Sequence, residues 1–237
     1  MLTIDEIRIE NQANSCITDA VQPSVSFTLA SDQQDTSLAK ALVKIGSWET
    51  TSCDQLDIRY TGPLAPFTTY PVQLTAFSTC GERAEATSSF QTGRLGLPWK
   101  AKWITDASCT PEKDHSPLPM TFRKTFTVRK PVARAYVIVT AIGIVDLMLC
   151  GERVTKDYFV PGFTSYKHDL QYVFYNVTHL LAPSSCLTAV VGGGWAVGRF
   201  TYNSKSQITA KRQALLLELF IDYADGTQEK IVTDESW

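Results

Sequence analysis

The sequence lacks several features that would point directly to a function. Its formal net charge is only −2 at pH 7, so it has no excess of basic residues for binding nucleic acid. No apolar run is long enough to cross a bilayer. The N-terminus, MLTIDEIRIENQ, is acidic and alternating, whereas a signal peptide is basic and then apolar. These absences predict a cytoplasmic protein with no nucleic-acid or membrane partner, or a periplasmic or secreted one if the N-terminus was trimmed.

Metal and redox motifs are absent as well. The cysteines are Cys16, Cys53, Cys80, Cys109, Cys150 and Cys186. No two of them form a C-x-x-C pair, and no group of cysteines and histidines has the spacing of zinc ligands. We therefore predict reduced thiols rather than disulfides, and neither a metal site nor a cofactor.

The sequence also has no catalytic motif of the common kinds. It contains no G-x-S-x-G elbow, and Gly192-Gly193-Gly194 lacks the helix and the Lys-Ser/Thr pair of a phosphate-binding loop. Glycines that follow a strand instead indicate a bulge or a close backbone approach. The acidic residues near the C-terminus are Asp222, Asp225, Glu229, Asp234 and Glu235. They fall on or beside an expected hairpin, where acids favour turns and solubility, so we predict no catalytic residue among them.

Short alternating segments dominate what is present. Residues 1–93 contain roughly seven such strands, for example residues 2–9, 24–29 and 70–77, and turn residues separate them. This spacing predicts a small β-sandwich domain. Residues 94–98 form a short linker with Gly and Pro, which marks a domain boundary. Trp99 and Trp103 follow it, and we expect them to pack one domain onto the next rather than to bind a ligand.

One stretch of the first domain resembles a fibronectin type III domain. LAPFTTY (64–70) is similar to the L-x-P-x-T-x-Y stretch of that fold. The resemblance implies that Tyr70 is the corner tyrosine, whose hydroxyl bonds to nearby backbone. Phe27 stands where that family usually has tryptophan, and Trp48 is expected to pack in or beside the core.

Residues 99–237 predict a second all-β domain. Its expected strands are 121–128, 133–142, 144–149, 171–177, 214–223 and 228–233. Cys150-Gly151 is an expected tight turn, and Asp225-Gly226 between two apolar runs is the strongest hairpin signal in the chain. The predicted fold class is therefore all-β, with a fibronectin III or Ig-like sandwich followed by a jelly-roll or galactose-binding-like sandwich.

Several ordered motifs make the second domain similar to the N-terminal sandwich domain of bacterial α-L-rhamnosidases. They are AKWI (101–104), FRKTFTV (122–128), CGERV (150–154), PGFTSYKHDLQYVFYNVTHLL (161–181), VGGGWAVGR (191–199) and YADGTQEKIVTDESW (223–237). Where that family has Asn-Gly, Trp-Thr and Gly-Trp-Tyr, this chain has Cys150-Gly151, Phe163-Thr164 and Gly194-Trp195-Ala196. A fibronectin-like module ahead of the sandwich also fits the family.

The resemblance implies a role without catalysis. In that family a downstream (α/α)₆ barrel carries the general acid and base, and this sequence has no run of long amphipathic helices. We therefore expect an inactive N-terminal accessory part of an enzyme that hydrolyses terminal α-L-rhamnosides. Its expected partners are the downstream catalytic domain of the same polypeptide and a rhamnose-containing glycan. The second domain is expected to be truncated at its C-terminal end.

The candidate substrate-binding residues are Trp195, Arg199 and Tyr166. Glycines allow a backbone to approach a sugar, Trp195 offers an apolar ring, and Arg199 can donate to hydroxyls. The alternative is that Trp195 is buried or docks onto the downstream domain. Residues 200–213 form a long connection that could border a substrate cleft or be disordered. Two other functions stay open: a stand-alone carbohydrate-binding or adhesion module, and a purely structural interaction protein.

Overall fold

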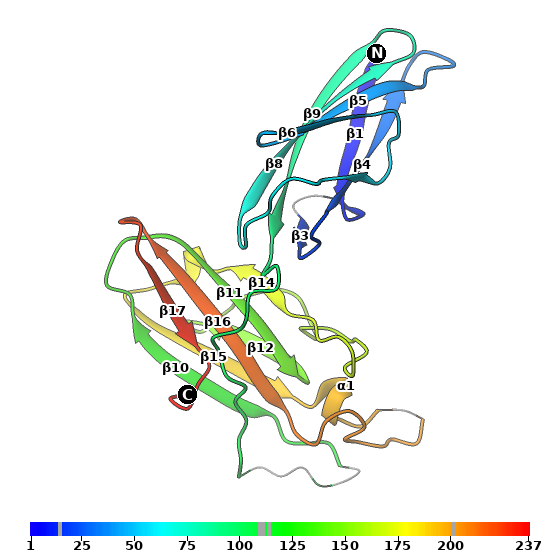
Figure 1. Ribbon diagram of the computed structural model, residues 1–237. Helices are drawn as coiled ribbons and strands as arrows, with labels where there is room; N and C mark the ends of the chain where they lie inside the picture. The colour runs from blue at the N-terminus through cyan, green and yellow to red at the C-terminus, as the bar shows by residue number, and fades with distance from the viewer. Residues whose placement is uncertain (14–15, 109–111, 113–114, 201) are drawn as a thin grey trace. The chain divides into compact units, whose positions relative to one another are not determined.

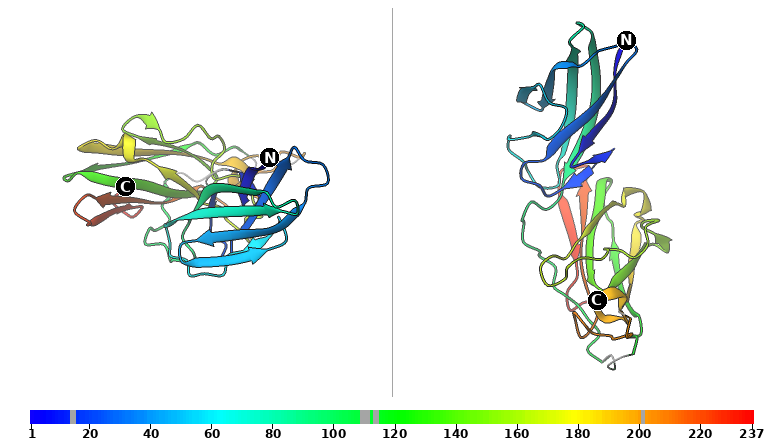
Figure 2. Two further views of the ribbon diagram at one scale, coloured as in Figure 1. Left: turned by 90° about the horizontal axis from the view of Figure 1, so that it is seen from above. Right: turned by 90° about the vertical axis from the view of Figure 1, so that its right-hand side faces the viewer.

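The computed structural model of the protein describes residues 1–13, 16–108, 112, 115–200 and 202–237. Strands, drawn as arrows in Figures 1 and 2, make up most of the regular structure in these residues. The chain divides into two units, Met1–Pro98 and Trp99–Trp237. Each unit contains two sheets, which confirms the predicted all-β class with two β-sandwich domains.

The first unit is a sandwich built on alternating strands. Its strands are β1 (Leu2–Ile9), β2 (Gln12–Ala13), β3 (Cys16–Thr18), β4 (Ser24–Ser31), β5 (Leu38–Ile45), β6 (Trp48–Ser52), β7 (Ile58–Arg59), β8 (Thr69–Ser78) and β9 (Arg83–Thr92). One sheet has the order β2-β1-β4-β7 and the other the order β3-β9-β8-β5-β6. Alternate residues of both sheets, such as Val43 and Leu74, are buried in one core, as the period-two pattern requires.

Tyr70 has the predicted corner contact. Its hydroxyl accepts a hydrogen bond from the Ala65 backbone N–H at 2.8 Å, and its ring stacks on that of Phe90 with centroids 5.2 Å apart. Phe27 is 2% exposed and fills the core position where tryptophan is usual. Trp48 is half-buried and packs edge-on against Tyr60, which confirms that it belongs to the packing of this unit.

The second unit has two sheets that enclose one core. Its elements are β10 (Met120–Thr127), β11 (Val132–Ile142), β12 (Ile144–Leu149), β13 (Glu152–Arg153), β14 (Val173–Asn176), a 3₁₀ turn η1 (Thr178–Leu180), β15 (Ser184–Gly192), α1 (Gly194–Val197), β16 (Ala214–Tyr223) and β17 (Gln228–Val232). The sheet orders are β10-β15-β12-β13 and β14-β11-β16-β17, with antiparallel pairs. Val137 and Leu217 of one sheet are buried in the same core as Leu147 and Leu187 of the other.

Both predicted turns of this unit are confirmed. Cys150 and Gly151 have φ values of 53° and 86°, the left-handed pair that a tight hairpin between β12 and β13 needs. At the other turn, Gly226 has φ 82°, and Asp225 accepts a hydrogen bond from the Thr227 N–H at 3.0 Å. The hydrogen bond from Lys130 lowers the pKa of Asp225, so this acid serves the turn.

A buried carboxylate fixes the start of the second unit. Glu218, on β16, is 2% exposed and accepts hydrogen bonds from the backbone N–H groups of Lys100 and Ala101. Ile104 then forms a bridge with Leu215 of the same strand. These hydrogen bonds and the bridge attach residues 100–104 to β16. A carboxylate can be buried here because the two backbone N–H groups satisfy it.

Trp99 and Trp103 differ in their surroundings. Trp99 packs edge-on against Tyr172, with ring centroids 6.0 Å apart, whereas the Trp103 side chain is 43% exposed.

The described cysteines Cys16, Cys53, Cys80, Cys150 and Cys186 are free thiols. Cys109 lies outside the described residues. None of the helices in the described part of the chain has the length and apolar character that a membrane span requires.

Replacing Tyr70 with phenylalanine should destabilise the first unit by about 1 kcal/mol, because the Ala65 N–H loses its acceptor while the ring packing remains. Urea unfolding followed by circular dichroism measures this as a lower midpoint. Tyr202→Phe is the control, since that side chain is fully exposed and should leave the midpoint unchanged. Equal midpoints for Tyr70→Phe and the wild type would contradict the corner role.

Candidate functional site

A glycine-rich turn positions the predicted ligand loop. β15 ends at Gly192, and α1 begins two residues later at Gly194, beside the long loop that follows β13 (Figure 1). A Cβ atom on Gly143, which has φ 126°, would overlap the Gly192 carbonyl oxygen. A Cβ atom on Gly193 would meet Pro117. The glycines therefore mark the close backbone approach that the sequence predicts, because only glycine leaves room for it.

The sequence does not predict the one-turn helix α1. It covers Gly194–Val197 and follows the glycines directly. The prediction of no helix at this point is therefore wrong, since Gly194 adopts φ 47° and lets the chain turn into a helix at once. No Lys-Ser/Thr pair follows the glycines, so the turn still has none of the side chains of a phosphate-binding loop.

Five aromatic side chains gather around this turn, and we call them the aromatic cluster. They are Phe159, Phe163, Tyr166, Trp195 and Phe200. The Trp195 ring lies 5.7 Å from that of Phe159 and 5.8 Å from that of Phe163. Phe163 also contacts Tyr166 and Phe200, each at 5.8 Å. Phe159 and Phe163 are 63% and 58% exposed, so the cluster presents an apolar aromatic surface to solvent.

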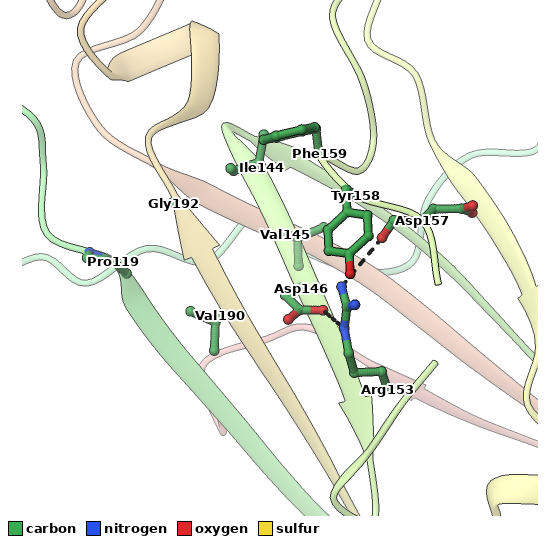
Figure 3. Close-up of a pocket in the computed structure, with 10 residues that line it drawn as sticks. All are labelled: Pro119, Ile144, Val145, Asp146, Arg153, Asp157, Tyr158, Phe159, Val190 and Gly192. Carbon is green, nitrogen blue, oxygen red and sulfur yellow. Dashed lines mark hydrogen bonds and ion pairs between the residues drawn. The ribbon is translucent and has the colours of Figure 1, made fainter. Parts of the chain in front are cut away.

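A cavity of about 490 Å³, which we call the side pocket, lies beside the aromatic cluster. Its lining residues are Pro119, Ile144, Val145, Asp146, Arg153, Asp157, Tyr158, Phe159, Val190 and Gly192. Phe159 belongs both to this lining and to the cluster. Figure 3 shows Arg153 between Asp146 and Tyr158, across the pocket from Val190 and Pro119.

The Arg153 guanidinium is held from several sides. Its Nε donates to Asp146 at 2.9 Å, and the group lies over the Tyr158 ring, 4.9 Å from the centroid. Its Nη2 is 3.5 Å from the Asp157 carbonyl oxygen. The hydrogen bond to Asp146 raises the pKa of Arg153. The pocket therefore combines apolar walls with one fixed pair of opposite charges.

Comparison with protein families identifies both units. The family model for the α-L-rhamnosidase N-terminal domain matches residues 130–237. The model for the Rha78A-like, N-terminal immunoglobulin domain matches residues 4–96. This chain belongs to the N-terminal region of the α-L-rhamnosidases. The predicted resemblance is thereby confirmed for both parts of the chain.

Curated α-L-rhamnosidases are similar to this N-terminal region over part of their length. One from Alteromonas sp. (strain LOR) is 34% identical over 147 residues, which are 60% of this chain and 16% of the relative. One from Formosa agariphila is 31% identical over 170 residues, which are 66% of this chain and 18% of the relative. The chain thus spans less than a fifth of the length of these relatives.

Solved rhamnosidase structures share the fold. The native enzyme from Aspergillus terreus superposes with a TM-score of 0.91 at 24% identity, over 100% of this chain and 29% of that one. The Streptomyces avermitilis enzyme, solved in complex with L-rhamnose, superposes with a TM-score of 0.88 at 18% identity, over 99% of this chain and 40% of that one. At these identities the likeness establishes the fold.

Two of the three predicted site residues lie in the aromatic cluster of this rhamnosidase region. Trp195 and Tyr166 both contact Phe163 and are half-buried. Burial raises the pKa of Tyr166, and its hydroxyl donates to the Gly162 carbonyl oxygen at 3.4 Å. Arg199 is exposed, follows α1, and donates through Nε to the Ser204 carbonyl oxygen at 3.2 Å. Their role in binding stays a prediction.

Phe159, Phe163 and the pocket residues are not among the site residues that the sequence predicts. A usable signal existed for Phe163, because it stands where the rhamnosidase family has the tryptophan of its Trp-Thr pair. Arg153 lies next to the Cys150-Gly151 turn, but nothing in the local pattern shows that it returns to Asp146. Contacts of this kind depend on the folded sheet.

The chemistry available here suits binding better than acid–base catalysis. Asp146 is paired with Arg153, and Asp157 accepts a hydrogen bond from the Tyr175 hydroxyl at 3.0 Å. The hydrogen bond from the Ser236 side chain lowers the pKa of Asp234, the opposite of what a general acid needs. Among the described residues, no group of three or more His, Cys, Asp and Glu is arranged to hold a metal.

Replacing Gly143 with alanine should destabilise the second unit by about 3 kcal/mol or more, because the new methyl group meets the Gly192 carbonyl and the residue has φ 126°. Gly226→Ala is the matched control. Gly226 also has a positive φ, but open space surrounds it, so the expected cost is only about 1 kcal/mol. Urea unfolding of both variants measures the difference, and equal losses would contradict the close approach.

Proposed function

We propose that this chain is the non-catalytic N-terminal accessory part of an α-L-rhamnosidase-like glycoside hydrolase. The observation that carries the proposal is the match of both units to N-terminal domains of that family, over residues 4–96 and 130–237. The chain also spans only 16% and 18% of two curated relatives. On this proposal the complete enzyme removes terminal α-L-rhamnosyl groups, and the general acid and base lie on an (α/α)₆ barrel elsewhere in the polypeptide.

The accessory part has two roles in this proposal. Its sandwich supports the catalytic domain, and the aromatic cluster forms one wall of the substrate pocket. Exposed rings such as Phe163, backed by Trp195, offer flat apolar surfaces to the C–H faces of a sugar. Arg199 and the Tyr166 hydroxyl supply polar contacts at the edge of this wall.

The proposed domain organisation is a first domain of residues 1–93, a linker of residues 94–98 and a second domain of residues 99–237.

The chain by itself should not hydrolyse 4-nitrophenyl α-L-rhamnopyranoside above the rate without protein. Glycoside hydrolysis requires two carboxyl groups that face one sugar, and Asp146 beside the aromatic cluster is occupied by Arg153. Release of nitrophenol at high protein concentration measures the activity. Turnover that disappears when Asp146, Asp157 or another acid of this chain is changed to its amide would refute the accessory role.

Trp195→Ala should weaken binding of a rhamnose-containing oligosaccharide at least about tenfold, because the ring contacts Phe159 and Phe163 and its loss disrupts the cluster surface. Isothermal titration of both proteins measures the change. Trp103→Ala is the control, since it removes an exposed tryptophan from the same unit without touching the cluster. Equal, negligible binding by wild type and Trp195→Ala would count against any saccharide contact here.

The same titration addresses the second candidate function, a stand-alone carbohydrate-binding module. The exposure of Phe159 and Phe163 favours it, because solvent-exposed aromatic surfaces serve such modules. A module of this kind should bind the oligosaccharide with the affinity of the complete protein. An accessory wall should bind it much more weakly than the complete enzyme, since the rest of the pocket is missing.

A further inference from the structure

The side pocket has a chemistry of its own, distinct from that of the aromatic cluster. Its floor is apolar and includes Ile144 and Val190. Its rim carries the Asp146–Arg153 pair, in which the carboxylate accepts hydrogen bonds and the guanidinium donates them. Asp157 also lines the pocket, and its carboxylate accepts a hydrogen bond from the Tyr175 hydroxyl, so the lining residues have no excess of positive charge. This combination favours a neutral ligand with one apolar face and several hydroxyl groups.

Strand register holds this rim in place. Asp146 of β12 lies directly opposite Val190 of β15, and Arg153 of β13 lies opposite Met148 of β12. Asp146 and Met148 are two residues apart, so their side chains and that of Arg153 share the sheet face away from the core. The Tyr158 ring, from the following loop, lies 4.9 Å from the guanidinium carbon. Polar groups fixed by strands in this way form a site before any ligand arrives.

We propose that the side pocket is a second saccharide-binding site, which takes one neutral pyranose unit with its apolar face on Val190 and Ile144. Two ring hydroxyls of the sugar meet Asp146 and Arg153. The inference rests on the proposed function for its class of ligand, but it uses residues outside the predicted set of Trp195, Arg199 and Tyr166. Phe159, shared by the pocket and the cluster, makes the two surfaces continuous.

The charge balance gives a specific test. Methyl α-L-rhamnopyranoside is the neutral probe and D-glucuronate the charged one, both titrated into the full chain and followed by protein NMR shifts. The wild type should bind the neutral probe and not the glucuronate. Asp146→Asn should weaken binding of the neutral probe about tenfold, because the sugar hydroxyls lose a charged acceptor.

Asp222→Asn is the matched control. It also breaks an aspartate–arginine pair of the second unit, with Arg134 at 3.0 Å, but on the other sheet. It should leave both titrations unchanged. Val190→Phe fills the pocket without touching the charged pair, and it should abolish binding of the neutral probe. The thermal unfolding midpoint of each variant verifies that it is folded, so a loss of binding in a folded variant reports on the pocket.

Each outcome separates this inference from the proposed function. If Asp146→Asn and Val190→Phe lose binding of the neutral probe while Trp195→Ala binds it as the wild type does, the side pocket alone is supported. If Trp195→Ala loses binding of the neutral probe while Asp146→Asn and Val190→Phe retain it in full, the side-pocket proposal is overturned. The aromatic cluster is then the sugar contact. No binding of the neutral probe by the wild type overturns the side pocket, while the accessory role is still decided by the hydrolysis assay.

Discussion

The close approach of Gly143 and Gly192 is the constraint on which the candidate site depends. Any side chain at Gly143 would occupy the space of the Gly192 carbonyl. Because this space is empty, β12 and β15 stay paired up to Ile144 and Gly192, and α1 can start beside the end of β12. Trp195 in α1 and Ile144 in the pocket floor are thereby fixed relative to each other. One backbone contact thus organises both the aromatic cluster and the side pocket.

The two surfaces differ in how their residues are supported. Asp146 and Val190 stand on strands whose opposite faces are packed in the core, so their positions are set by the sheet. Phe159 and Phe163 belong to the long loop after β13 and are held by contacts among the rings themselves. A rigid polar rim beside an adaptable aromatic surface suits ligands that share one sugar unit and differ beyond it.

The sequence predicts the fold of this chain better than its site. Alternation at period two indicates most of the long strands, and the Cys150-Gly151 and Asp225-Gly226 turns are read correctly because turn chemistry is local. Tyr70 is placed correctly for the same reason. The contacts of Trp195 with Phe159 and of Arg153 with Asp146 join residues that no periodic pattern relates. They follow from register and loop packing, which only the folded chain contains.

Cys150 bears on how the hairpin between β12 and β13 is held together. A residue with a side chain pays about 1 kcal/mol or more to adopt a left-handed conformation, and Cys150 does so at φ 53°. Its turn is therefore a poor nucleus for the β12–β13 hairpin, which has only two paired positions. The Asp146–Arg153 pair joins the two strands of this hairpin, so the charged rim of the pocket also helps to offset the conformational cost of its turn.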